Sequence, residues 1–123
     1  MSKILVVEDN EMNRDMLSRR LRRAGYEVVC AEDAPGGVSM TRQECPDVVL
    51  MDVALGAVDG WEATQQIRSD PLVAAIPIIA LTAHALDSDR RRSVEVGCFD
   101  FDTKPVDFNR LMGKIQRALG CKK

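Results

Sequence analysis

Three acidic positions in this chain could together hold a divalent cation. Glu8 and Asp9 follow the apolar run Ile4–Val7. Asp52 follows a second apolar run, Val48–Met51. Three carboxylates placed together repel one another unless a cation lies among them. Mg²⁺ suits such oxygen ligands, because it uses few protein groups and keeps positions for water and phosphate oxygens.

Two further polar residues follow strand-like runs in the same way. Thr82 ends the run Pro77–Leu81, and Lys104 follows the alternating segment Phe99–Thr103. A hydroxyl donor and an ammonium charge complete a site for a tetrahedral anion. A carboxylate beside Mg²⁺ and a lysine can itself be the nucleophile, so Asp52 could form an aspartyl phosphate. Each residue alone is more often a cap or a solvated charge, but five together make coincidence a poor explanation.

The elements that would position these residues alternate along the chain. Short apolar runs bounded by turn residues are typical of strands buried on both faces. The expected strands are 4–7, 26–31, 48–52, 77–82 and 99–103, and the expected helices begin after Asn10 and Asp33, at Trp61, at Asp87 and after Asp107. This pattern predicts an α/β fold with a five-stranded parallel sheet, doubly wound and flavodoxin-like, in the order 2-1-3-4-5. The carboxyl ends of such strands meet at one edge, where ligands bind.

Composition restricts the class of protein. The 123 residues suit one soluble domain spanning 1–123, with 46% hydrophobic and 29% charged residues. The net charge of −2 argues against broad binding to nucleic acid. Four scattered cysteines without metal-binding spacing suit a reducing cytoplasmic compartment. No apolar stretch approaches the length of a membrane span.

The motifs together resemble the response-regulator receiver domains of two-component signalling, over essentially the whole chain. The segments that carry the resemblance, in the family's order and spacing, are Val6–Asn10, Asn13-Arg14, Leu50–Asp52, Asp59-Gly60, Ala80–Ala83 and Lys104-Pro105. The resemblance implies a signalling phosphoacceptor in a phosphorelay rather than an enzyme acting on a separate substrate. Such a protein catalyses its own phosphoryl transfer and slow dephosphorylation.

The resemblance also implies residue roles at the site. Asp52 would accept a phosphoryl group from a phosphohistidine on a histidine kinase or a histidine phosphotransfer protein. Asp9, Asp52 and the carbonyl of Ala54 would ligate Mg²⁺, and Glu8 would act through water. Lys104 would pair with the phosphoryl group, and its peptide bond to Pro105 would be cis.

A switch follows from the same resemblance. Thr82 would move to bond the phosphoryl group, and Phe101, at the family's aromatic switch position, would turn inward after it. The charge on Asp52 would thereby change the surface of the fourth helix, fifth strand and fifth helix, where a downstream protein would bind. A monomer or weak dimer is expected, with no binding to nucleic acid or membrane.

Several positions depart from the family pattern. Gly56 stands where proline is frequent, Phe101 lacks the hydroxyl of the commoner tyrosine, and Phe99 replaces a polar residue. Asp102 stands where an aliphatic residue is expected. It is predicted either to be solvated at a sheet edge or to compete with the phosphoryl group for Lys104, and Asp102→Leu is predicted to raise stability.

Other functions stay open at this point. A degenerate receiver would act by protein–protein interaction alone, against which the complete set of site residues argues. A flavodoxin-like module for a nucleotide, flavin or other small ligand would want a glycine-rich loop where Glu8-Asp9-Asn10 stands. A magnesium-dependent phosphohydrolase would need an acidic residue as general base at the position of Ala54.

The chain is expected to be a single-domain regulator or the excised receiver of a longer protein. The basic face of the helix after Asn10 is either a solvated surface or a kinase-docking surface.

Overall fold

The computed structural model describes residues 2–53, 59–83 and 87–120, which form five strands and five helices in alternation. The strands are β1 (Lys3–Val7), β2 (Glu27–Ala31), β3 (Val48–Asp52), β4 (Ile78–Thr82) and β5 (Asp100–Thr103). The helices are α1 (Glu11–Arg23), α2 (Ala34–Glu44), α3 (Gly60–Arg68), α4 (Asp87–Val96) and α5 (Phe108–Gly120). The predicted bounds differ from these by a residue or so, as is usual at element ends. Ala54 and Gly56 lie outside the described residues.

The strands form one parallel sheet in the order β2-β1-β3-β4-β5, which confirms the predicted topology. β3 lies at the centre of the sheet, and all five of its residues are buried. Because a central parallel strand is covered on both faces, it needs a continuous apolar sequence rather than an alternating one. The run Val48–Met51 meets that need and carries Asp52 to the edge where β1 and β4 also end.

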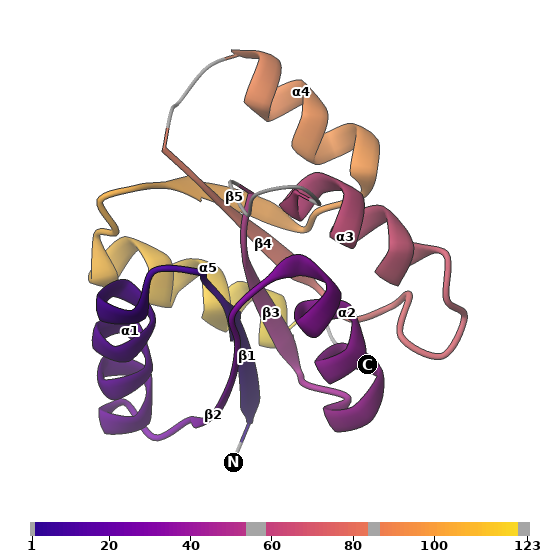
Figure 1. Cartoon of the computed structure of the whole chain (residues 1–123). Helices are drawn as coiled ribbons and strands as arrows, with labels where there is room; N and C mark the ends of the chain where they lie inside the picture. The colour runs from indigo at the N-terminus through magenta and orange to yellow at the C-terminus, as the bar shows by residue number, and fades with distance from the viewer. Residues whose placement is uncertain (1, 54–58, 84–86, 121–123) are drawn as a thin grey trace.

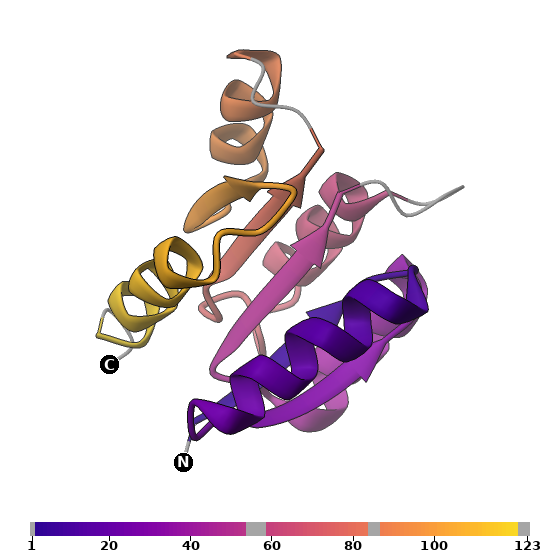
Figure 2. The same cartoon turned by 90° about the vertical axis from the view of Figure 1, so that its left-hand side faces the viewer.

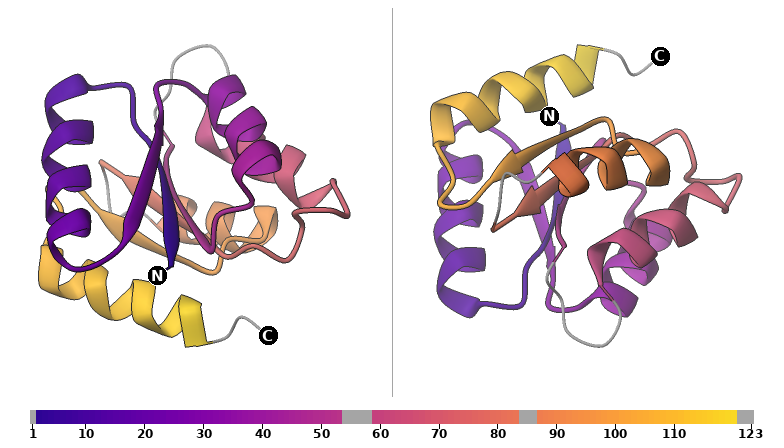
Figure 3. Two further views of the ribbon diagram at one scale, coloured as in Figure 1. Left: turned by 90° about the horizontal axis from the view of Figure 1, so that it is seen from below. Right: turned by 90° about the horizontal axis from the view of Figure 1, so that it is seen from above.

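Helices cover both faces of the sheet (Figures 1, 2 and 3). On one face, α1 and α5 bury Leu21 and Ile115 against residues of β1, β3 and β4. On the other face, α2 and α3 bury Val38 and Ile67, and α4 contributes Val96 next to Trp61. Burial of such side chains stabilises the fold by about 1.5–3 kcal/mol each. None of the helices in the described ranges has the length and apolar character needed to cross a membrane.

Side-chain caps precede four helices in the described ranges: α1, α2 and α5 follow the predicted caps Asn10, Asp33 and Asp107, and α3 begins after Asp59, one residue before the predicted start at Trp61. Asn10 accepts a hydrogen bond from the backbone N–H of Asn13 at 2.9 Å. Asp33, Asp59 and Asp107 cap α2, α3 and α5 in the same way, with bonds of 2.7, 2.9 and 3.1 Å to the N–H three residues later. Each cap satisfies an N–H that the first turn of a helix leaves without a partner.

Candidate functional site

The three predicted carboxylates meet at the carboxyl edge of the sheet. Glu8 and Asp9 follow β1, and Asp52 ends the neighbouring strand β3. Each of the three offers an oxygen atom within 4.8 Å of the other two. Glu8 and Asp52 are buried, whereas Asp9 is exposed. A cluster of hard oxygen donors that opens to solvent on one side fits Mg²⁺, which keeps part of its water shell.

Lys104 lies between the two buried acids. Its Nζ atom is 2.8 Å from Glu8 Oε1 and 2.8 Å from Asp52 Oδ2. Its backbone N–H donates to the Thr82 carbonyl at 2.7 Å, and its peptide bond to Pro105 is cis, as predicted. The lysine therefore places a positive charge of the protein itself between the two buried carboxylates.

Burial changes the ionisation of this group of residues. Burial is the main reason that the pKa of Glu8 rises to about 7, and a hydrogen bond with Asp52 adds to the rise although Lys104 opposes it. Burial alone would lower the pKa of Lys104, but its hydrogen bonds to Asp52 and Glu8 outweigh that effect and raise it. Glu8 consequently binds a proton near neutral pH, and a metal ion would displace that proton.

Glu8→Gln is expected to stabilise the protein at high pH. The folded protein binds the Glu8 proton with a pKa of about 7, against 4.5 for an ordinary glutamate. Because the pKa is raised on folding, the stability contribution of Glu8 is greatest below pH 4.5 and is lost as the pH rises through 7. We expect the variant to gain about 1–2 kcal/mol at pH 8, after allowing for solvent at the open site, and to match the original protein near pH 4.5. Urea unfolding across this pH range without divalent cations measures the difference, and parallel pH profiles would contradict the assignment.

The site includes positioning residues that the sequence indicated only as motif members. Arg14 of α1 donates to the Glu8 carbonyl at 2.9 Å and reaches Glu32 at 3.4 Å, so it ties the acidic turn to the end of β2. The Asn10 backbone N–H donates to Glu8 Oε2 at 3.2 Å. Gly60 begins α3 so close to Asp52 that a Cβ atom there would collide with the Asp52 carbonyl oxygen. These contacts give a physical reason for Arg14 and Gly60 in the two motifs.

Thr82 ends β4 one residue beyond Leu81, which pairs with Asp52 across the sheet. The threonine is buried, and its hydroxyl donates to the Asp89 carboxylate of α4 at 3.3 Å. Phe101 is half-buried on the face of α3 and α4, where it packs against the cluster of Trp61, Ala80 and Val96. Thr82 and Phe101 therefore lie on adjacent strands and both contact the α4 layer.

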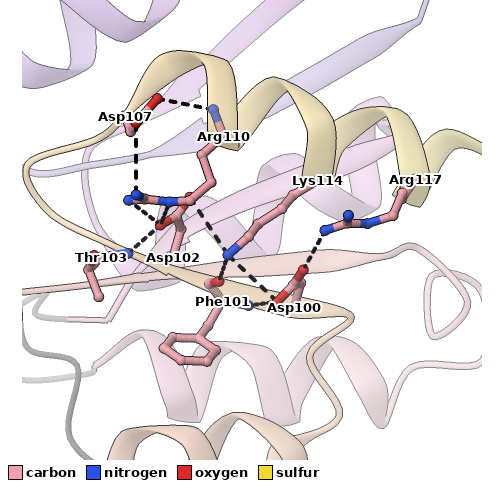
Figure 4. Close-up of polar contacts among 8 residues, drawn as sticks. All are labelled: Asp100, Phe101, Asp102, Thr103, Asp107, Arg110, Lys114 and Arg117. Carbon is pink, nitrogen blue, oxygen red and sulfur yellow. Dashed lines mark hydrogen bonds and ion pairs between the residues drawn. The ribbon is translucent and has the colours of Figure 1, made fainter.

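Asp102 corrects the sequence-based interpretation (Figure 4). Its side chain is 2% exposed rather than solvated, and it accepts hydrogen bonds from Arg110 Nε at 2.8 Å and from the Thr103 N–H at 2.8 Å. Lys114 lies 3.8 Å from its other oxygen. Both predicted placements were wrong, because Lys104 bonds Glu8 and Asp52 while Asp102 faces α5. The overlooked signal was the row of cations spaced four and three residues apart along α5, Arg110, Lys114 and Arg117.

Comparisons with known proteins point to one family. The sequence profile described as "Response regulator receiver domain" matches residues 4–116. Protein PilH of Pseudomonas aeruginosa is 37% identical over 119 residues, which cover 97% of this chain and 98% of that protein. The polar-differentiation response regulator DivK of Brucella anthropi is 32% identical over 117 residues, 95% of each chain. The receiver domain of a P. aeruginosa sensor histidine kinase, solved with a magnesium ion in its active-site cleft, matches at TM-score 0.89 and 37% identity, covering 97% of this chain and 98% of that one.

Proposed function

Because this chain belongs to the response regulator receiver family of two-component signalling, we propose that Asp52 is its phosphoacceptor and that its donor is a phosphohistidine. The observation that carries the proposal is the contact between the buried Asp52 carboxylate and Lys104 Nζ at 2.8 Å, with Glu8 and Asp9 beside it. In the transfer, an Asp52 oxygen forms a bond to phosphorus as the bond from phosphorus to the histidine nitrogen breaks. The neutral histidine leaves with the electron pair of the broken bond.

The side chains of the site divide the remaining work. Asp9 and Asp52 would hold Mg²⁺, with the Ala54 carbonyl as the third protein ligand that the family resemblance implies and with Glu8 acting through water. The bound ion would neutralise charge on the carboxylates and on the transferred phosphoryl oxygens. The Lys104 ammonium, already bonded to Asp52, orients that carboxylate and is in place to pair with a phosphoryl oxygen.

The output of this reaction would be a change at α4, β5 and α5. Thr82 now donates to Asp89, and it would donate instead to a phosphoryl group on Asp52. Phe101 would then turn toward the space that Thr82 leaves. The resulting surface would bind a downstream protein, so the added charge is converted into a change of partner affinity.

The exposed face of α1 supports a docking role for the phosphodonor protein. Met12 is 81% exposed and Met16 is 51% exposed, although both are apolar. Arg19, Arg20 and Arg23 surround them on one side of the helix. Methionine and arginine are enriched in protein interfaces, and Met16 and Arg20 line one pocket together with Glu8 and Lys104 of the site. We propose that this side of α1 binds the histidine kinase or phosphotransfer protein.

The proposal is tested by incubating the protein with a small phosphodonor and Mg²⁺ and measuring its intact mass. We expect one phosphoryl adduct, which disappears in Asp52→Asn and when the metal is chelated. Asp33→Asn is the matched control, because asparagine can also cap α2 and the adduct should remain. Absence of an adduct on the unaltered protein, with or without the metal, would instead favour a receiver that acts without phosphorylation.

A further inference from the structure

The two residues that would move in the proposed switch are both held by consecutive residues of α4. Thr82 Oγ1 donates to Asp89 Oδ2 at 3.3 Å. The guanidinium carbon of Arg90 lies 5.3 Å from the centre of the Phe101 ring, within the range of a cation–π contact. One turn of a single helix therefore contacts both Thr82 and Phe101.

α5 holds Phe101 from a second direction (Figure 4). Lys114 Nζ donates to the Phe101 carbonyl and lies 5.7 Å from the centre of its ring. Asp100 and Asp102 lie 3.9 and 3.8 Å from the same ammonium. Because Asp102 is buried and also bonded to Arg110, it is a fixed anchor that keeps Lys114 beside Phe101.

We propose that Asp89, Arg90 and Lys114 form a latch that holds Thr82 and Phe101 in the unphosphorylated arrangement. The inference rests on the proposed function of Asp52. A threonine hydroxyl has one proton, so Thr82 must leave Asp89 before it can donate to a phosphoryl oxygen. Phe101 has no hydroxyl that would favour one position of its ring, and the two cations supply that preference.

The latch stabilises the resting conformation of Thr82 and Phe101. Its removal should therefore raise the population of the active conformation in the unphosphorylated protein. Contacts that exist in only one of two conformations shift their populations by the full difference in free energy. We expect Asp89→Ala and Arg90→Gln each to raise the rate constant of phosphorylation by a small donor roughly three- to tenfold. The two changes alter the net charge in opposite directions. Simple electrostatic attraction of an anionic donor would therefore speed one and slow the other.

The controls are Glu95→Ala and Arg91→Gln, which make the same charge changes at exposed positions of α4. Both should leave the phosphorylation rate constant within about 30% of its original value, because salt screens the charges of exposed side chains. If Asp89→Ala and Arg90→Gln behave like these controls while the unaltered protein is phosphorylated on Asp52, the latch is overturned and the proposed function stands. If the unaltered protein acquires no phosphate on Asp52, the proposed function fails.

A measurement without a phosphodonor tests the latch whether or not Asp52 proves to be phosphorylated. The NMR signals of the Thr82 methyl group and the Phe101 ring report the surroundings of these two residues in the unphosphorylated protein. We expect Asp89→Ala to shift the Phe101 signals and Arg90→Gln to shift the Thr82 signal, because both residues share one equilibrium. Signals that shift only next to the substituted residue would overturn the proposal, and Lys114→Met should reproduce the effect of Arg90→Gln.

Discussion

Lys104→Met is expected to lower the free energy of unfolding by about 3 kcal/mol at pH 8 without divalent cations. The lysine is bonded at 2.8 Å to two carboxylates whose side chains are only 4% and 3% exposed. Removing it takes away the ammonium group that lies between these two buried carboxylates. An uncompensated buried charge destabilises far more than the loss of a surface ion pair.

Two conditions should restore most of that stability. Protonation at pH 5 neutralises Glu8, whose pKa is already raised to about 7 and would rise further without Lys104. Mg²⁺ supplies a replacement cation and binds only the folded site. Urea unfolding at pH 5 and pH 8, with and without Mg²⁺, measures both effects.

Lys3→Met is the matched control for this experiment. The side chains of Lys3 and Lys104 are similarly exposed, at 25% and 24%, and each contacts two acids. The partners of Lys3 are 51% and 27% exposed, so they can be hydrated when the lysine is lost. The loss of Lys3 should leave the free energy of unfolding nearly unchanged, and this result should not depend on Mg²⁺. If Lys104→Met and Lys3→Met lose equal amounts of unfolding free energy, the burial of the acids does not determine the effect of losing the lysine.

The Asp102–Arg110 pair should respond in opposite directions to the loss of either partner. Arg110→Met is expected to lower the free energy of unfolding, because it leaves the buried Asp102 carboxylate with the Thr103 N–H and with Lys114, 3.8 Å away, as its nearest described cation. Asp102→Leu is expected to raise it by about 1 kcal/mol. Asp102 pairs across the sheet with Leu81, so a leucine there would join the apolar face covered by α5, and Arg110, 47% exposed, would turn to water.

Urea unfolding of the two single variants and of the double variant tests this asymmetry. The double variant should resemble Asp102→Leu, because without the buried acid the loss of Arg110 costs little. Arg117→Met is the control, since Arg117 is 65% exposed and pairs with the half-buried Asp100 at 3.4 Å. It should change stability by less than about 0.5 kcal/mol. A destabilising Asp102→Leu would show that the ion pair itself stabilises the β5–α5 contact.

Much of the fold and of the site could be predicted because the information is local. The apolar run before Asp52 identifies a central strand, and caps such as Asn10 and Asp33 mark the starts of helices. Parallel strands end at one edge, so acids, a threonine and a lysine placed after successive strands must converge. Glu8 and Lys104 could therefore be assigned to one site although they lie 96 residues apart.

The partners of several charged side chains could not be predicted, because they belong to helices that pack over the sheet from elsewhere in the chain. The alternation of β5 placed Asp102 on the opposite side of the strand from Phe101. Only the packing of α5 over that face brought Arg110 within 2.8 Å and made the acid buried and paired instead of solvated. The contacts of Asp89 and Arg90 likewise depend on how α4 lies over β4 and β5.

The sequence by itself determined the fold, the strand order and the convergence of Glu8, Asp9, Asp52 and Lys104, since these follow from periodicity and chain direction. The tertiary structure decided how the charges are paired, since burial and distances of a few ångströms set the strength of each electrostatic contact. It raised the pKa of Glu8 to about 7 and placed Lys104 as the internal cation. It also turned Asp102 from an apparent anomaly into the anchor of the β5–α5 network.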